Sequence, residues 1–505
     1  SSPLPGARGA RCGDAPSKRR CRSSQAVVMQ GLLSLLVCRR RQRQAFGDPA
    51  DRNTGAEMGS PSPITSREEP HRLWEVRRSS IDFPSLGLLA DAPEEMRQEL
   101  LLAKVRECCI TYDFRTNERQ ADKDAKTATL LEIVEYVSDN QHAFQESLYP
   151  DLLQMVAVNI ARSYSLRPFH PLALMDMEEQ ELHFEPNWIH LQSVYEFFLR
   201  FTVSDYVNPK VVKKYIKPAF INHFVEGFLS EDPRERDYLK TILHRFYGRF
   251  VSLRLHVKQA LRQFLFRFVY EIETTSGVAE LLEVIGCIIN GFSVPLKLDN
   301  VELLEKALLP MQRAKSLQQF YPQLDFCLTQ YVAKVPELLQ NILWSALHSW
   351  PHRSAFKQVS FLNTIEVILL ADVDEFSRCT ECRRAVFMKV AHCIEYNHFH
   401  VAERALLMWN RDPFAALVGD QRDAIFPIVA PALARSASGH WSKTIRKMAE
   451  EVKSRVRAQD EDLFDRCVQD AKDSEEREKE IESSRQRMWD AAAAAAKAAE
   501  EARRT

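Results

Sequence analysis

A group of possible zinc ligands begins with two cysteines that are separated by two residues. Its members are Cys379, Cys382, His392, Cys393, His398 and His400. Thiolate and imidazole groups at close spacing are the usual ligands of structural zinc. However, the intervening segment RRAVFMKVAHCI has a helical pattern, and no second closely spaced pair follows. We therefore interpret these residues as a surface loop and a buried core cysteine, and we expect no metal or other cofactor.

A second segment, Gly47 to Asn53 (GDPADRN), resembles an element of two-metal phosphoesterases in which aspartates hold the metals. A two-metal centre needs several converging ligands, and the companion elements G-D-x-H-G and G-N-H-E are absent from the sequence. The P-loop, H-E-x-x-H, G-x-S-x-G and protein-kinase motifs are absent as well. We interpret the match as a coincidence and expect no catalytic residues.

Basic residues form a stripe in the region from Glu231 to Asn300. The segment DYLKTILHRFYGRFVSLRLHVKQALRQ, which follows the acidic turn EDPRERD, is predicted to be one helix. Its apolar face comprises Leu239, Ile242, Leu243, Phe246 and Phe250. The residues that lie partly off this face are His244, Arg245, Tyr247 and Arg249. Farther along, basic residues recur at four-residue steps and so share one helical face; these are Arg254, Lys258 and Arg262.

Two interpretations of this stripe remain open. Runs of charge are most often solvated surface. Alternatively, guanidinium groups bind carboxylates and phosphates well, and the next apolar segment, GVAELLEVIGCIINGF, supplies a hydrophobic wall. The stripe and this wall would then form a groove for an acidic, partly apolar peptide.

The composition indicates helices as the elements that position these residues. Glycine accounts for 15 of 505 residues, about 3% where about 7% is usual, which disfavours turn-rich β structures and phosphate-binding loops. Lysine and arginine (68) balance aspartate and glutamate (69), and the net charge of -1 predicts neither nucleic acid nor a membrane surface as partner. Most of the 11 cysteines lie in apolar helical patterns and are interpreted as reduced thiols of a cytoplasmic or nuclear protein.

Hydrophobic periodicity extends over nearly the whole segment from Pro93 to Arg457. Apolar residues recur at three- and four-residue steps, without convincing strand-like alternation. Examples are Leu130, Leu131, Val134 and Val137, and Leu281, Leu282, Ile285, Ile288 and Ile289. Because single cores stop growing at roughly 250–300 residues, we predict an all-α fold, a HEAT-like α-solenoid of stacked antiparallel helix pairs.

A weak internal repeat agrees with this architecture. Several predicted helices open with an aromatic residue or valine, then proline, any residue, and leucine or valine. The prolines concerned are Pro150, Pro322, Pro336 and Pro427. Proline suits the first helical turn, where its missing N–H costs nothing. Their spacing is irregular, so the pattern is at best a degenerate repeat of about 40–47 residues.

Changes in composition predict three regions. Residues 1–90, rich in Arg, Ser, Pro and Gly, are expected to be a disordered basic tail, residues 91–458 the helical-repeat domain, and residues 459–505 a charged, helical C-terminal tail. The apolar segment from Val27 to Cys38 loosely resembles the core of a signal peptide. It is shorter than the roughly 20 residues that span a bilayer, so we expect no membrane span and interpret it as part of the tail.

Several segments, in order along the chain, closely resemble the B-prime regulatory subunits of protein phosphatase 2A. They are RECCITYDF (106–114), EPNWIHLQSVYEFFLRF (185–201), DPRERDYLKTILHRFYGRFVSLR (232–254), FVYEIETTSGVAELLEVIGCIINGFSVPLK (268–297), SLQQFYPQLDFCLTQYV (316–332), FLNTIEVIL (361–369), HFHVAERALLMWN (398–410) and HWSKTI (440–445). The resemblance covers residues 91–467. It implies a HEAT-like solenoid that assembles with a scaffold subunit and a catalytic subunit, and whose concave side binds short L-x-x-I-x-E segments of disordered proteins.

The same resemblance implies a set of peptide-binding residues. They are Thr241, His244, Arg245, Tyr247, Arg254, Lys258, Glu283, Val284, Ile288 and Lys297. Tyr247, Val284 and Ile288 would wall the apolar pockets, and His244 and Arg245 would meet the glutamate of the motif. Arg254, Lys258 and Lys297 would attract acidic or phosphorylated flanks.

Three positions depart from the family pattern. Val284 replaces an isoleucine and lacks one methylene, which should weaken a pocket by at most about 1 kcal/mol. Lys258 replaces an arginine and loses the bidentate fork. Asn300 replaces a histidine, which removes a charge that could assist the binding of acidic flanks.

The sequence thus favours a non-catalytic targeting subunit of the protein phosphatase 2A heterotrimer that acts in the cytoplasm and nucleus. It would hold disordered substrates or adaptors near the catalytic subunit, and the metals and the chemistry would belong to that other chain. An alternative is a HEAT-repeat scaffold or transport adaptor unrelated to a phosphatase, because a solenoid alone fits either function.

Overall fold

A computed structural model describes residues 86–114, 116, 118–140, 143–162, 164, 184–271 and 276–504. The predicted N-terminal tail lies outside the described residues except for residues 86–90. The phosphoesterase-like match at Gly47 and the apolar segment from Val27 to Cys38 also lie outside them.

The described residues form helices and connecting turns, and they contain no β-strand, which confirms the all-α prediction. The α-helices are α2 (Glu94–Glu107), α3 (Gln120–Asp139), α4 (Tyr149–Ile160), α5 (Trp188–Val203), α6 (Pro209–Val212), α7 (Pro218–Glu226), α8 (Pro233–Arg249), α9 (Arg254–Tyr270), α10 (Val278–Asn290), α11 (Leu298–Leu303), α12 (Leu309–Met311), α13 (Tyr321–Lys334), α14 (Leu338–His348), α15 (Ala355–Ala371), α16 (Val373–Arg378), α17 (Thr380–Ile394), α18 (Phe399–Leu407), α19 (Asp412–Asp420), α20 (Arg422–Gly439), α21 (Lys443–Arg457) and α22 (Glu461–Arg504).

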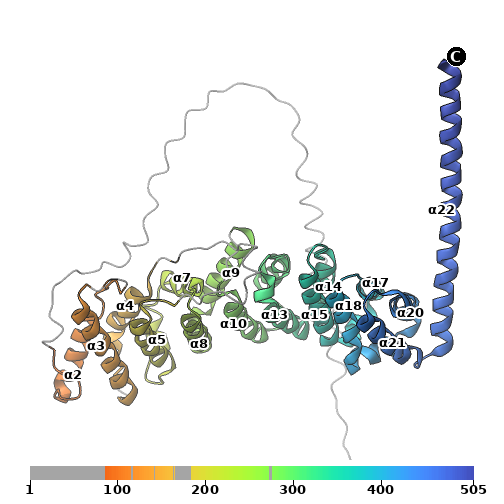
Figure 1. The fold of residues 1–505 in the computed structure, drawn as a ribbon. Helices are drawn as coiled ribbons and strands as arrows, with labels where there is room; N and C mark the ends of the chain where they lie inside the picture. Colours follow the sequence, from red (N-terminus) through yellow and green to blue (C-terminus); the bar gives the residue numbers. More distant parts are fainter. Residues whose placement is uncertain are drawn as a thin grey trace, which may run out of the picture. The chain divides into compact units, whose positions relative to one another are not determined.

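These helices pack as a solenoid with two layers (Figure 1). In the first layer, each helix contacts the next in the order α3, α5, α8, α10, α13, α15, α18 and α21. In the second layer, the corresponding order is α2, α4, α7 and α9, followed by the π-helical turn Leu304–Leu308, α12, α14, α17 and α20. Because each helix contacts mainly its neighbours, one hydrophobic core continues between the layers along the stack.

The apolar periodicity of α8 and α10 explains why both helices dock into this core. On α8, the buried apolar side chains are those of the predicted face, Leu239, Ile242, Leu243 and Phe246. On α10, the predicted residues Leu281, Leu282, Ile285, Ile288 and Ile289 are all buried. On α3 the prediction is only partly confirmed, because Leu131 is 50% exposed whereas Leu130 is fully buried.

Two of the four prolines were assigned incorrectly from the sequence, and one of them, Pro336, lies in the turn before α14 rather than in its first helical turn. Pro150 and Pro322 lie in the first turns of α4 and α13, as predicted. Pro427 instead lies inside α20, together with Pro431. An internal proline removes a backbone hydrogen bond and costs about 3 kcal/mol. The burial of Phe426, Val429 and other apolar side chains of α20 offsets this local cost.

The predicted single helix from Asp237 to Gln263 is two helices in the structure. α8 ends at Arg249, Phe250 leaves the helical conformation with φ -90° and ψ 69°, and α9 begins at Arg254 after the 3₁₀ turn Val251–Leu253. The break has a tertiary cause, because α8 belongs to the first layer and α9 to the second. Phe250 and Leu253 are buried at the corner between the layers.

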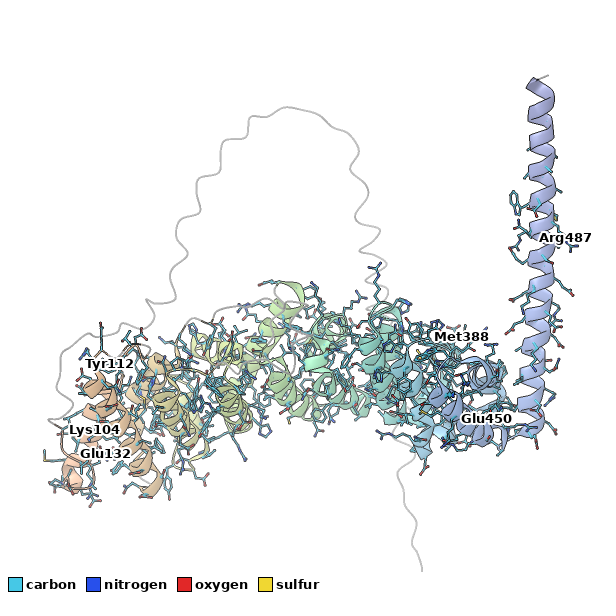
Figure 2. The ribbon with its side chains drawn as sticks, in the orientation of Figure 1. Lys104, Tyr112, Glu132, Met388, Glu450 and Arg487 are labelled. Atoms are coloured by element: carbon cyan, nitrogen blue, oxygen red, sulfur yellow. The ribbon has the colours of Figure 1, made fainter. Side chains whose placement is uncertain are left out.

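The helix α22 begins in the stack and continues beyond it. Its first turns pack against α20 and α21 and bury Phe464 and Cys467. From Glu476 to Ala496 every side chain is exposed, as for Arg487 in Figure 2. Alanine, glutamate, lysine and arginine have high helix propensity and favour helix in this solvated segment. Within the described ranges, no helix combines the length and the apolar character needed to cross a membrane.

Candidate peptide-binding site

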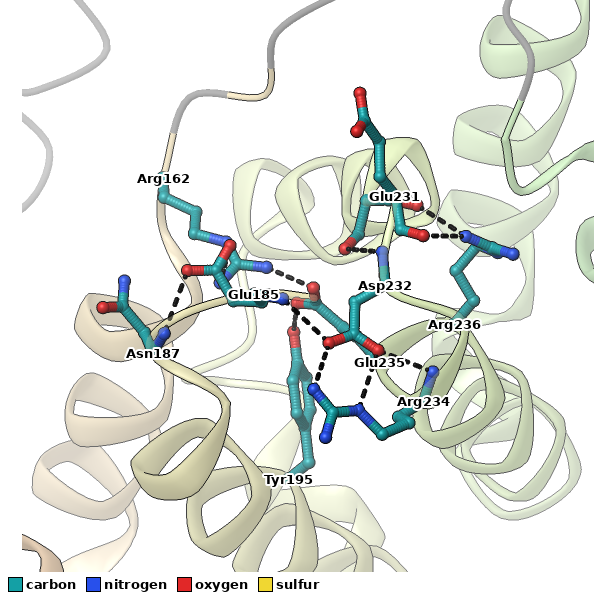
Figure 3. A network of polar contacts seen from close by, with 10 residues as sticks. Arg162, Glu185, Asn187, Tyr195, Glu231, Asp232, Arg234, Glu235 and Arg236 are labelled. Carbon is teal, nitrogen blue, oxygen red and sulfur yellow. Dashed lines mark hydrogen bonds and ion pairs between the residues drawn. The ribbon is translucent and has the colours of Figure 1, made fainter. Parts of the chain in front are cut away.

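A buried polar network holds the N-terminus of α8, on which the candidate site begins (Figure 3). Asp232 caps α8, because its carboxylate accepts hydrogen bonds of 2.9 Å from the backbone N–H groups of Arg234 and Glu185. Burial opposes ionisation of Asp232, but the hydrogen bonds from Arg234 and Glu185 outweigh it and lower the pKa of the carboxyl. The cap therefore stays charged where it meets the first turn of the helix.

Glu235 joins α8 to two other parts of the chain. Its carboxylate is fully buried, accepts a 2.6 Å hydrogen bond from the hydroxyl of Tyr195 on α5 and pairs with the guanidinium of Arg162. The next residue, Arg236, pairs with Glu280 of α10 at 2.7 Å. Such buried charges require partners, so the network fixes how α8 lies against α5 and α10.

The face of α8 that is turned away from the core carries the predicted glutamate-binding residues. His244 and Arg245 are exposed, and among the described residues neither has a hydrogen-bond or ion-pair partner. Thr241 and Tyr247 are half-buried, and burial raises the pKa of the Tyr247 phenol. The imidazole of His244 and the guanidinium of Arg245 are therefore available to a ligand, beside partly covered apolar surface.

Arg254 has a structural role that the sequence did not suggest. Its guanidinium donates to the backbone carbonyl oxygens of Tyr247 and Gly248, at 2.9 and 3.0 Å. It also lies 5.0 Å from the centroid of the Tyr247 ring. Carbonyl groups in the last turn of a helix lack helical partners, so Arg254 caps α8 across the α8–α9 corner and holds Tyr247 in place.

A pocket of about 50 Å³ opens between α9, α10 and α11. Its lining residues are Leu255, Lys258, Gln259, Leu261, Arg262, Ile285, Ile288, Phe292, Asp299, Asn300 and Leu303. The structure therefore brings two of the predicted residues, Lys258 and Ile288, together in one apolar hollow with a basic edge. Val284, one turn before Ile288 on α10, is 2% exposed and does not line this pocket.

The charges around the pocket are not all basic. Burial lowers the pKa of Lys258, and the nearby charges of Lys297 and Arg262 lower it further. The ammonium nitrogen of Lys258 lies 5.8 Å from the centroid of the Phe292 ring. Arg262 pairs weakly with Asp299 at 3.9 Å and with Glu302 at 3.6 Å. A ligand carboxylate would therefore meet two ammonium groups that already repel each other.

The remaining predicted residues lie at the edges of this region. Glu283 of α10 pairs with Lys240 of α8 at 3.1 Å, so it links the two helices and is not free to select a ligand. Lys297 is exposed immediately before α11. Asn300 lines the pocket, and its backbone carbonyl accepts a 2.7 Å hydrogen bond from the hydroxyl of Tyr331.

Sequence reasoning missed several residues of the pocket. Phe292 follows Ile288 by four positions and continues its apolar face, which was the available signal. Asp299 and Leu303 are supplied by α11, a six-residue helix whose position depends on the turn after α10. No local pattern indicates that this turn would fold against α9.

The site offers binding groups and no recognisable catalytic set. Across the ranges described above, no group of three or more His, Cys, Asp and Glu residues could hold a metal ion. For the cysteine pair considered as zinc ligands, the reason lies in helix geometry. His392 is ten residues beyond Cys382 on the same helix, α17, about 15 Å along the axis.

The known proteins to which this chain is similar are regulatory subunits of protein phosphatase 2A. A family model described as "Protein phosphatase 2A regulatory B subunit (B56 family)" matches residues 86–496. The delta isoform of the 56 kDa regulatory subunit of rabbit serine/threonine-protein phosphatase 2A is 39% identical over 81% of this chain and 70% of its own length. The B' theta isoform of Arabidopsis thaliana is 39% identical over 81% of this chain and 83% of its own. The B' kappa isoform of rice is 37% identical over 92% of this chain and 94% of its own.

Proposed function

The chain belongs to the B56 family of protein phosphatase 2A regulatory B subunits, and from this premise we propose how it acts. It joins the scaffold and catalytic subunits of the phosphatase and holds disordered proteins that carry L-x-x-I-x-E segments. The relatives are named as regulatory subunits, in agreement with a non-catalytic regulator. Membership in this family removes the alternative of a helical-repeat adaptor unrelated to a phosphatase.

The observation that carries the motif proposal is the combination of free charge and apolar pocket on adjacent helices. His244 and Arg245 are exposed on α8, and Ile288 of α10 and Lys258 of α9 line one pocket. A carboxylate on Arg245 gains a charge-assisted hydrogen bond, and an aliphatic side chain in the pocket gains about 25 cal/mol for each Å² of apolar surface removed from water. An acidic segment with spaced aliphatic residues satisfies both requirements.

In this proposal, binding promotes dephosphorylation through effective concentration. A segment held on α8 and α10 tethers its own phosphorylated residues near the catalytic subunit, at a local concentration of the order of millimolar for a short flexible linker. Selection of substrates then depends on the docking segment and on linker length. The reaction, with its metal ions, takes place on the catalytic chain.

The test has two parts. Affinity purification of the full chain from cell extract is expected to recover the scaffold and catalytic subunits. In a separate titration of a fluorescent L-x-x-I-x-E peptide, Arg245→Ala should weaken binding by about tenfold or more, because it removes a charge-assisted hydrogen bond worth roughly 1.5–3 kcal/mol. The helical circular dichroism should stay unchanged.

A matched control is Arg384→Ala, which removes another exposed arginine, on α17. It should leave the peptide affinity unchanged. Equal affinity of the Arg245→Ala variant and the parent chain would contradict the groove. Failure to recover the two subunits would contradict the assembly, whatever the peptide does.

A further inference from the structure

Cys379 and Cys382 lie together at the beginning of α17. Cys379 is the residue that precedes the helix, with φ -91° and ψ 93°, and Cys382 is the third residue of the helix. At a helix start, the side chains at these two positions lie close together, and in a capping box each one reaches the backbone N–H of the other residue. The two side chains are close enough for Cys379 to influence the electrostatics of the Cys382 thiol.

The two thiols differ in access to solvent. Cys379 is half-buried, and Cys382 has no exposed surface. Burial, followed by the proximity of Cys379, raises the pKa of Cys382 to about 12. Cys379 makes no side-chain capping hydrogen bond. Cys379 is therefore the thiol that a reagent meets first.

We propose that Cys379 and Cys382 are a redox modification site, which a low-molecular-weight disulfide such as oxidised glutathione converts to an intrachain disulfide. The Cys379 thiolate attacks one glutathione sulfur, the glutathione S–S bond breaks, and one glutathione thiolate leaves. Cys382 then loses its proton and attacks the Cys379 sulfur of the mixed disulfide, which releases the second glutathione thiolate. Two protein thiols are oxidised and one glutathione disulfide is reduced to two thiols.

The other described cysteines lack this combination. Cys108 and Cys109 are adjacent in sequence, with Cα atoms about 3.8 Å apart across a trans peptide bond, closer than the 4.4–6.8 Å usual for a disulfide. Cys327 and Cys393 are fully buried, and Cys467 is 8% exposed. Cys287 is exposed, so its reaction with glutathione measures the reactivity of a thiol at the surface. This inference concerns α17 and is independent of the proposed peptide groove.

The disulfide would constrain a junction inside the second layer. Cys379 joins α16 to α17, and α17 packs against α14 and α20. Across this junction, the buried guanidinium of Arg383 donates to the backbone carbonyl of Ser377 at 2.5 Å. Linking the two sulfurs would restrict the first turn of α17, and we expect slower amide hydrogen exchange there in the oxidised chain.

The experiment treats the full folded chain with oxidised glutathione, then labels the remaining thiols with N-ethylmaleimide in guanidinium chloride, and finally digests the chain with trypsin. Cleavage after Arg378 and Arg383 releases one peptide, Cys-Thr-Glu-Cys-Arg, that contains both cysteines. In the untreated chain this peptide should carry two maleimide groups. After treatment it should carry none and weigh two hydrogen masses less than the unlabelled dithiol peptide, and reduction with dithiothreitol before the labelling step should restore the doubly labelled peptide.

Two variants and a measurement on the unfolded chain test whether the disulfide depends on both thiols and on the fold. Cys382→Ser should stop at the glutathione adduct on Cys379, and Cys379→Ser should leave Cys382 unreacted. In guanidinium chloride, the ratio of disulfide to glutathione adduct in this peptide should fall about tenfold, because the helix no longer aligns the two sulfurs. A folded chain in which Cys287 gains glutathione while both maleimides persist on the peptide would overturn the proposal. A bond from Cys379 or Cys382 to any other cysteine would also overturn it.

Discussion

At the scale of single residues, Lys258 places an ammonium group at the edge of the pocket. An ammonium is a point charge, whereas a guanidinium forms two parallel hydrogen bonds with one carboxylate. Lys258 also lies close enough to Lys297 and Arg262 that their charges lower its pKa, in addition to the effect of burial. The affinity of this chain for a peptide with an acidic flank should therefore depend on pH.

Lys258→Arg tests this dependence. A lowered lysine pKa means that the positive charge is lost as the pH rises toward the usual value of 10.5, so the parent chain should bind an acidic peptide progressively more weakly. The arginine stays charged, and it should bind about fivefold more tightly at neutral pH, a gain of roughly 1 kcal/mol. Fluorescence anisotropy between neutral and alkaline pH measures both effects. Parallel pH profiles for the two chains would contradict the assigned role of Lys258.

Asp325 is a buried carboxyl at the contact between α13 and α15. Its side chain accepts a 2.6 Å hydrogen bond from the hydroxyl of Thr364. Burial raises its pKa from 3.8 to about 7, against the opposing effect of Thr364. The folded chain then binds a proton that the unfolded chain releases between these two values, so the free energy of unfolding falls as the pH rises from about 4 to 7. Above the pKa of Asp325 in the folded chain, about 7, this contribution to the free energy of unfolding is fully lost.

Asp325→Asn is therefore expected to stabilise the chain at pH 8 and to have little effect at pH 4. The gain at pH 8 is at most about 4 kcal/mol, since each pKa unit corresponds to 1.36 kcal/mol. Urea denaturation at the two pH values measures it, with Asp412→Asn as a matched change at an exposed carboxyl. Equal effects of Asp325→Asn at both pH values would show that this carboxyl does not titrate between them.

At the scale of elements, the start of α10 depends on one glycine. Gly277 has φ +80°, a left-handed conformation that side chains with a Cβ rarely adopt. A Cβ built on it would lie 1.8 Å from the backbone carbonyl oxygen of Phe228. Phe228 belongs to the 3₁₀ turn Gly227–Leu229 that precedes α8, so this close approach sets α10 against the chain before α8.

Gly277→Ala should lower the free energy of unfolding by more than about 2 kcal/mol, because left-handed strain and a backbone clash add together.

Gly248→Ala should have the opposite effect on the free energy of unfolding. Gly248 lies in the last turn of α8, and nothing lies within 4 Å of an added Cβ, so alanine should stabilise by roughly 0.5–1 kcal/mol. Chemical denaturation of the two variants measures the contrast. A Gly277→Ala chain as stable as the parent would contradict the close packing at α10.

At the scale of the whole molecule, two-layer packing makes stability nearly a sum over neighbouring helices. Ion pairs with a buried partner join neighbouring helices along the stack. Lys104 of α2 and Glu132 of α3, for example, are 2.5 Å apart (Figure 2), and Arg404 of α18 pairs with Glu366 of α15. A helical segment that does not pack against a neighbouring helix should then contribute little to the free energy of unfolding.

The exposed part of α22 is such an element. Deletion of residues 477–505 keeps Phe464, Cys467 and the 2.7 Å ion pair between Glu475 and Arg435. We expect the midpoint of thermal unfolding to change by less than about 2 °C, because surface changes away from packed contacts have small effects. The helical circular dichroism at low temperature should decrease. A large drop in the midpoint would show that this segment packs against the stack.

Much of the fold follows from local pattern. The periodicity of α8 and α10 identified their buried faces, and it left His244 and Arg245 on the exposed side of α8. These are properties of 3.6-residue spacing within one segment. The family resemblance, which added the function and the ten candidate residues, rests on matched sequence and not on this spacing.

Other features depended on segments that are distant in the sequence. The break at Phe250, the capping of α8 by Arg254 and the internal position of Pro427 in α20 each follow from which helix surfaces meet. The pocket likewise needs α11 to fold against α9 and α10. The sequence by itself determined that this chain is helical and which side of each major helix is apolar, because neighbouring residues decide periodicity. Only the tertiary structure decided where helices end and which side chains share a pocket, because contacts between distant residues outweigh local preference.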